Sequence, residues 1–164
     1  MGAAARLADL GLTLPAVAAP VAAYVPAVRT GAYVHTSGQL PFVAGALPTT
    51  GKVGTGEGLV APDEAAALAR TAALNTLAAV AAVITSEGGP AGADALDRIV
   101  RVVKVVGFVA SDPTFTGQPG VINGASTLLQ EVLGEAGVHA RSAVGVAVLP
   151  LDSPVEVEIV VETV

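Results

Sequence analysis

A continuous run of apolar, mostly β-branched residues extends from Ile99 to Val109 and is the strongest constraint on the fold of this chain. Such a run is typical of a central strand that is covered on both faces, because a half-exposed strand alternates between apolar and polar residues. The run is apolar at nearly every position and contains Gly107, and Arg98, Arg101 and Lys104 mark its more polar start. The run therefore predicts a sheet with this segment inside it.

Two helical patterns flank this strand in the sequence. The first begins at Pro62, which is followed by the acids Asp63 and Glu64, a pattern that suits the first turn of a helix. Apolar residues then recur at helical spacing, and Gly88-Gly89-Pro90 ends the pattern. The second helix is predicted from about Gln118 to Val132. Both helices carry an apolar face that must pack on the sheet.

Hairpin patterns lie near both ends of the chain. Two β-rich stretches around a Thr30-Gly31 turn predict the first hairpin, and residues 139–158 predict the last one, with a turn at 149–154. The predicted order is β-β-α-β-α-β-β, an α+β fold with a single sheet and two helices on one face. In the last hairpin Ala143, Gly145 and Ala147 alternate onto the side of Arg141, and we expect this side to be left uncovered by the helices.

The composition indicates an oligomer. Hydrophobic residues make up 52% of the 164 residues and charged residues only 13%, about half the usual share for a soluble domain. An uncovered apolar sheet face on a chain this poor in charge predicts that the face is buried against other subunits.

Charge and residue types exclude several classes of function. The net charge is −6, which opposes binding to a phosphate backbone, so no nucleic-acid partner is expected. The chain has no cysteine, and its two histidines have no acidic cluster at metal-ligand spacing, so no metal and no other cofactor is expected. Prolines interrupt the uncharged run 10–28, so no membrane span is expected there, and the default location is the cytoplasm.

Three motifs carry a resemblance to a known family. The C-terminal segment reads Ala140-Arg141-Ser142, then Leu149-Pro150, then Val155-Glu156-Val157-Glu158. Near the other end, Tyr24 precedes Thr36-Ser37-Gly38-Gln39-Leu40-Pro41, and Asn123 lies in the second predicted helix. This set resembles the Rid family, the RidA/YjgF-like imine deaminases, and its chorismate-mutase-like subgroup. The resemblance covers a domain at residues 21–164, with residues 1–20 as an N-terminal helical extension.

The resemblance implies a fold, an assembly and a reaction. The implied fold is a chorismate-mutase-like trimeric barrel with a pocket at each subunit interface. The implied reaction is hydrolysis of 2-imino or enamine carboxylic acids to 2-keto acids and ammonia. Arg141 would bind the substrate carboxylate, for which a planar guanidinium is well suited, and Glu156 would orient or activate water. Both are the expected catalytic residues. The expected substrate-binding residues are Tyr24, Ser37, Gly38, Gln39, Asn123 and Ala143.

Other interpretations of the same residues stay open. The stretch Ala143-Val144-Gly145 lacks the hydroxyl or thiol and the glutamate that the family often has there. The alternative function is thus a non-catalytic trimer that binds small carboxylates or partner proteins, and ribonuclease activity is disfavoured by the acidic charge. Arg141 could also form an ion pair at an interface, and Glu156 could be a solvated strand residue.

Overall fold

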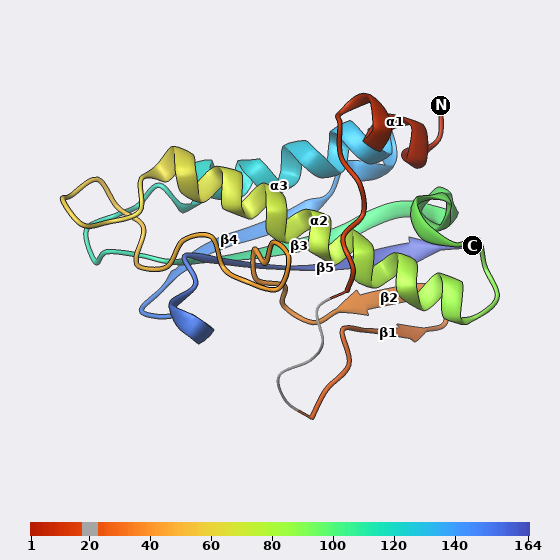
Figure 1. Ribbon diagram of the computed structural model, residues 1–164, viewed down its shortest axis with the longest axis horizontal. Coiled ribbons are helices and arrows are strands. Elements are labelled where there is room, and N and C mark those ends of the chain that lie inside the picture. Colours follow the sequence, from red (N-terminus) through yellow and green to blue (C-terminus); the bar gives the residue numbers. More distant parts are fainter. Residues whose placement is uncertain (18–22) are drawn as a thin grey trace.

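The computed structural model describes residues 1–17 and 23–164. Its helices and strands are α1 (Ala3–Asp9), β1 (Ala27–Thr30), β2 (Tyr33–Thr36), α2 (Pro62–Ser86), β3 (Ile99–Ala110), α3 (Gln118–Leu133), β4 (Ala140–Val146) and β5 (Val155–Thr163). Short 3₁₀ turns cover Gly92–Arg98, Gly134–Gly137 and Pro150–Asp152. After α1, the order is the predicted β-β-α-β-α-β-β, and the α+β class is confirmed (Figure 1).

The five strands form one sheet in the order β1-β2-β5-β3-β4. The first hairpin forms as predicted, with Thr30 opposite Tyr33. The last hairpin was predicted wrongly, because β4 and β5 are not neighbours. Strand β3 lies between them, parallel to β4 and antiparallel to β5. The segment between β4 and β5 therefore crosses the end of β3. Alternation along a single strand does not show which other strands it will pair with.

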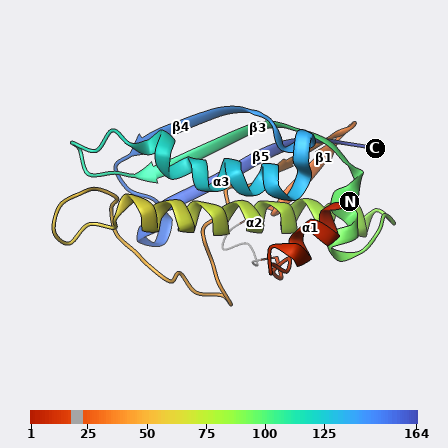
Figure 2. The ribbon, with the colours of Figure 1, turned by 90° about the horizontal axis from the view of Figure 1, so that it is seen from above.

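Helices α2 and α3 lie side by side on one face of the sheet (Figure 2). The core between these layers contains Leu77 and Val80 of α2, Ile122 and Leu129 of α3, and Val105 of β3, all fully buried. By length and hydropathy α2 could span a membrane, but 67% of its most apolar window is buried inside the protein. That burial is typical of a core helix.

The two helices approach closely at Gly124. A side chain there would overlap the backbone carbonyl of Ala66, so glycine permits the contact between α3 and α2. Gly107 has a similar role between the sheet and the helix layer. A Cβ there would lie 2.5 Å from the side chain of Ile122 of α3, which is closer than packed atoms allow. Gly107 therefore marks the point where α3 packs onto β3.

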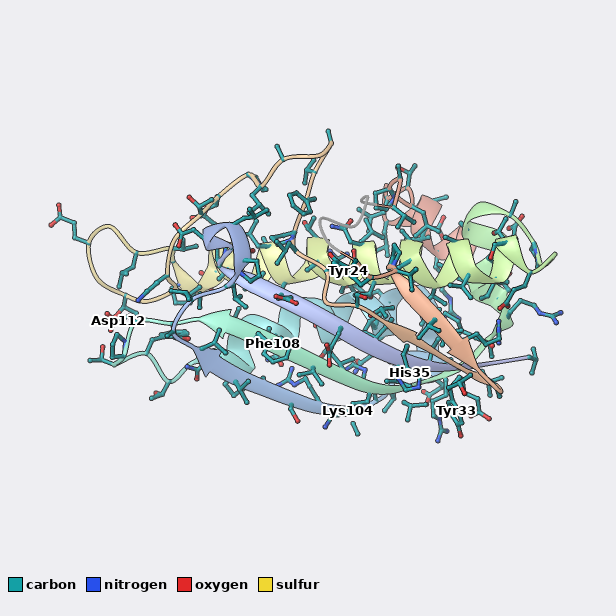
Figure 3. The ribbon with its side chains drawn as sticks, turned by 90° about the horizontal axis from the view of Figure 1, so that it is seen from below. Tyr24, Tyr33, His35, Lys104, Phe108 and Asp112 are labelled. Atoms are coloured by element: carbon teal, nitrogen blue, oxygen red, sulfur yellow. The ribbon has the colours of Figure 1, made fainter. Side chains whose placement is uncertain are left out.

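None of the described helices lies over the other face of the sheet (Figure 3). The strand register places Lys104 and Phe108 of β3 opposite Val160 and Glu156 of β5. His35 of β2, the strand that flanks β5 on its other edge, also lies opposite Val160. Val144 of β4 is also on this face, because it pairs with Phe108, and it is 44% exposed. We call this surface the open face. Among the described residues the helices thus cover β3 on one side only, as predicted for a sheet with two helices on one face.

The side chain of Arg141 is on the helix side of the sheet, not on the open face. Arg141 pairs with the buried Val105, and a Cβ on Gly145 would contact Gln118 of α3. The expectation that Arg141, Ala143 and Gly145 line the uncovered side was therefore wrong. It assumed that the small residues of β4 face outward, whereas α3 needs them in order to lie close to the strand.

The N-terminal segment folds against the rest of the chain. Ala3 and Leu7 of α1 are buried, and the backbone N–H of Ala3 donates to Asp97 Oδ1 at 2.6 Å. The short helix predicted there is thus present. The predicted division between residues 20 and 21 lies outside the described residues.

Candidate functional site

The predicted site residues fall into two groups on opposite faces of the sheet. Arg141, Asn123 and Ala143 lie where β4 packs on α3. Glu156, Gly38 and their neighbours lie on the open face. We call these the arginine group and the glutamate group.

In the arginine group, one stripe of α3 holds the guanidinium. Arg141 Nη1 donates to Asn123 Oδ1 at 2.8 Å and to Ser126 Oγ at 3.1 Å, and Nη2 donates to the carbonyl of Pro119 at 3.3 Å. Residues 119, 123 and 126 share a helix face by their spacing of four and three. No acid lies within ion-pair distance of Arg141 in the described part of the chain. None of the described residues therefore neutralises its charge.

The small residues of β4 make room beside this guanidinium. Ala143 packs on the edge of the core, and Gly145 lies against the side chain of Gln118. The Gln118 amide is held in turn, because its Nε2 donates to the carbonyl of Phe115 at 2.8 Å and to Ser111 Oγ at 3.2 Å. A larger residue at position 145 would have to displace this amide. The glutamate that the family often has here would therefore compete with Gln118 for space.

In the glutamate group, the loop after β2 lies directly on Glu156. A side chain at Gly38 would overlap the Glu156 carboxylate. The loop is held there by backbone pairing, since Gln39 and Val157 exchange two N–H···O bonds of 2.8 and 3.0 Å. From the helix layer, buried Asn75 donates to the carbonyls of Leu40 and Phe42. The sheet and α2 together position the loop over the carboxylate.

The surroundings of Glu156 favour its protonated form. Burial raises the pKa of this carboxyl above its usual range, and the charge of Glu158 on the same face raises it further. A carboxyl group that holds its proton more tightly is a better base once ionised, and it can also return the proton at a later step. Glu156 therefore has the electrostatic character of an acid–base residue.

Ser37 and Gln39 flank Gly38 in this loop, and Tyr24 lies just before Val25, to which Ser37 is bonded. The backbone N–H groups of Ser37 and Gln39 donate to the carbonyls of Pro26 and Val157, so they are not free to bind an anion. Ser37 Oγ donates to the carbonyl of Val25 at 2.6 Å and thereby ties the loop to the residue after Tyr24. Tyr24 is 45% exposed (Figure 3). Its ring is available for a contact outside the chain.

The structure adds two residues that the sequence interpretation did not place in the site. His139 Nε2 lies 2.9 Å from Ser126 Oγ, and that oxygen also contacts Arg141. His139 comes just before β4 and two residues before Arg141, so alternation along extended backbone was a usable signal for it. The signal for Ser126 was weaker, because it consisted only of the helical spacing of three residues from Asn123. Within residues 1–17 and 23–164, no group of three or more His, Asp or Glu side chains could hold a metal ion.

Comparison with known proteins identifies relatives over nearly the whole length. Residues 4–163 match the family model described as "YjgF/chorismate_mutase-like, putative endoribonuclease". The chain is 44% identical over 162 residues to Protein TCP17 of Trypanosoma cruzi, covering 97% of this chain and 92% of that protein.

Solved structures agree with this match. The crystal structure of Atu1372 from Agrobacterium tumefaciens has a TM-score of 0.83 and 41% identity, covering 99% of this chain and 92% of that one. The E. coli protein TdcF with bound serine has a TM-score of 0.58 and 25% identity, covering 93% and 96% of the two chains. With its motifs, its strand order and these relatives in agreement, the chain belongs to the YjgF/chorismate-mutase-like family, which includes the RidA-like proteins.

Proposed function

We propose that this protein hydrolyses small 2-imino carboxylic acids to 2-keto acids and ammonia, in pockets between the subunits of a homotrimer. The observation that carries the proposal is the guanidinium of Arg141, which is held by three neutral oxygens and, within residues 1–17 and 23–164, by no acid. A positioned arginine without a counter-ion is suited to bind a carboxylate. TdcF, a relative, was crystallised with serine, which carries a carboxylate beside an amino group.

The proposal requires a second subunit because the two groups lie on opposite faces of the sheet. Arg141 lies on the helix side and Glu156 on the open face, so one chain cannot bring them to the same substrate. Strand β4 is at the edge of the sheet, where another subunit can reach it. The open face carries exposed apolar residues such as Val28 and Val144. Burial of this face in a trimer would bring the glutamate group of one subunit to the arginine group of the next.

The proposed reaction needs one proton acceptor and one water molecule. Arg141 holds the carboxylate, and water attacks the carbon of the C=NH₂⁺ group while Glu156 takes a proton from it. The C=N electron pair moves to nitrogen and a carbinolamine forms. Glu156 then returns the proton to nitrogen, the C–N bond breaks and ammonia leaves. As the C=O bond forms, the ionised Glu156 takes the hydroxyl proton, which then passes to solvent. Every step uses a proton that Glu156 can accept or donate.

The test follows freshly generated 2-iminopropionate in the presence of the protein. We expect faster decay and release of pyruvate and ammonia with the wild type. Arg141→Ala should be slower by 100-fold or more, as roughly expected when a substrate-orienting charge is removed. If wild type and Arg141→Ala both match buffer, the proposal is wrong.

One observation favours a second candidate, a trimer that binds carboxylates without turnover. The Gln118 amide fills the space beside Gly145 where relatives often have a glutamate. Binding of pyruvate that depends on Arg141, without decay of the imine, would support this candidate. We do not propose ribonuclease activity, because the net charge of −6 repels a phosphate backbone.

A further inference from the structure

The hydrogen bonds of His139 determine which of its ring nitrogens carries the proton. Nδ1 lies 2.5 Å from the carbonyl oxygen of Gly137. A carbonyl oxygen can only accept, so Nδ1 is the protonated nitrogen. In the neutral ring Nε2 is then an acceptor, and Ser126 Oγ, 2.9 Å away, donates its hydroxyl proton to it.

This arrangement turns the lone pairs of Ser126 toward Arg141. A hydroxyl has one proton, so the bond to His139 leaves only acceptor positions on Oγ. Arg141 Nη1 donates to this oxygen with one proton and to Asn123 Oδ1 with the other. Two acceptors on a single Nη fix the plane of the guanidinium. In the described part of the chain no acceptor lies on Nε, and Nη2 has a second proton besides the one it donates to the carbonyl of Pro119, so Nε and Nη2 keep protons for a carboxylate.

We propose that Ser126 and His139 are positioning residues that hold the Arg141 guanidinium in the orientation that binds a carboxylate. This inference rests on the proposed function of Arg141 as a carboxylate-binding residue. It adds a chain of three hydrogen bonds, from the Gly137 carbonyl through His139 and Ser126 to Arg141, that links a backbone turn to the binding group.

The charges around His139 agree with a neutral ring. Burial lowers its pKa, and the nearby charge of Arg141 lowers it further, although the bond to Gly137 acts in the opposite direction. The other charged groups on the elements around it are Arg101 and Lys104 of β3, Glu131 of α3 and Glu135 of the turn before it. A protonated ring would donate from Nε2, and Ser126 would then receive two donors on one oxygen.

The experiment measures pyruvate binding by calorimetry, with pyruvamide as a neutral analogue that lacks the carboxylate. Ser126→Ala and His139→Phe both break the chain of hydrogen bonds, and each is expected to weaken pyruvate binding about tenfold, as for loss of a hydrogen bond to a charged group. Binding of pyruvamide should be unchanged, so the preference for the carboxylate falls by the same factor. Thr127→Ala, one residue along α3, and His139→Gln, which keeps an acceptor near Nε2, should behave as wild type.

Three outcomes separate this inference from the function on which it rests. Loss of the preference in Ser126→Ala and His139→Phe, with retention in both controls, supports it. Wild-type preference in those two variants, while Arg141→Ala binds no pyruvate, overturns the inference and leaves the function standing. Equal binding by wild type and Arg141→Ala overturns the function and the inference together. Thermal unfolding checks the fold of each variant, and either of the two disrupting variants decides the test if the other does not fold.

Discussion

Arg141 and Glu156 lie on opposite faces of one sheet, and strand β3 separates their strands. Arg141 is opposite Val105, whose side chain is in the core, whereas Glu156 is opposite Phe108 on the open face. Cross-strand partners share a face, so no rotamer change brings the two groups together. A site that uses both must take each from a different subunit.

This relationship predicts complementation between two inactive variants. Arg141→Ala and Glu156→Gln should each be inactive alone. When they are unfolded together and refolded as a mixture, about a quarter of the interfaces in a randomly mixed cyclic trimer combine the intact Arg141 with the intact Glu156. Imine hydrolysis should return to a corresponding fraction of the wild-type rate. No recovery from mixed trimers that have been confirmed by mass spectrometry would contradict a shared site.

Gly38→Ala is expected to reduce activity more than stability. The new Cβ would overlap the Glu156 carboxylate, which is the mobile end of a side chain and can move aside. Turnover should fall about tenfold or more, as for a displaced acid–base group. The urea midpoint should change little. Gly120→Ala is the matched control, because a side chain there meets no atom within 4 Å. Wild-type turnover in Gly38→Ala would show that the position of this carboxylate does not matter.

Gly124→Ala is expected to have the opposite profile, with a large loss of stability. Its Cβ would overlap the backbone carbonyl of Ala66, and backbone cannot move aside as a side chain can. Overpacking of this kind costs about 1–3 kcal/mol or more. The free energy of unfolding in urea should therefore fall by at least about 1 kcal/mol. Gly120→Ala, on the same helix, again serves as control. An unchanged urea midpoint would mean that α2 and α3 are farther apart than described.

Glu156 should make the protein less stable as the pH rises. Its raised pKa means that the folded protein keeps this proton at a pH where the unfolded chain, with the ordinary value near 4.5, has lost it. The folded state then binds more protons, so the contribution of this group to the unfolding free energy falls as the pH rises from 4.5 through the folded-state pKa.

Glu156→Gln removes this contribution. At fixed protein concentration, the variant should be more stable than wild type at pH 7, and the difference should shrink toward pH 4. Glu162→Gln, on the same face of β5, provides the comparison. A variant less stable than wild type at pH 7 would show that the ionised carboxylate is stabilised by a partner.

A charge on the open face should disrupt the proposed trimer. Phe108 is in the middle of this face, and Phe108→Glu would bury an unpaired carboxylate in any interface formed there (Figure 3). Light scattering should give the mass of a trimer for wild type and of a smaller species for the variant. Ala82→Glu, at an exposed position of α2, should leave the mass unchanged. A monomeric wild type would overturn the proposed shared pocket.

The sequence by itself determined the elements and their order. Apolar periodicity and terminal signals placed α2 from Pro62 and α3 from Gln118, and the valine run identified β3, because helix and strand periods are local properties of the chain. The Arg141 and Glu156 motifs were also readable from the sequence. The hydrogen bond between Arg141 and Asn123 could not be predicted from the sequence, although both residues were expected in the site.

Only the tertiary structure decided which strands pair and which face each side chain occupies. Residues 139–158 suggested a hairpin, but β3 lies between the two strands, and Arg141 faces α3 rather than the open face. The physical reason is that alternation specifies two faces without saying which one is covered. That choice depends on how α3 packs on β4 through Gly145 and Gln118, and it is the same packing that brings Ser126 and His139 to the guanidinium.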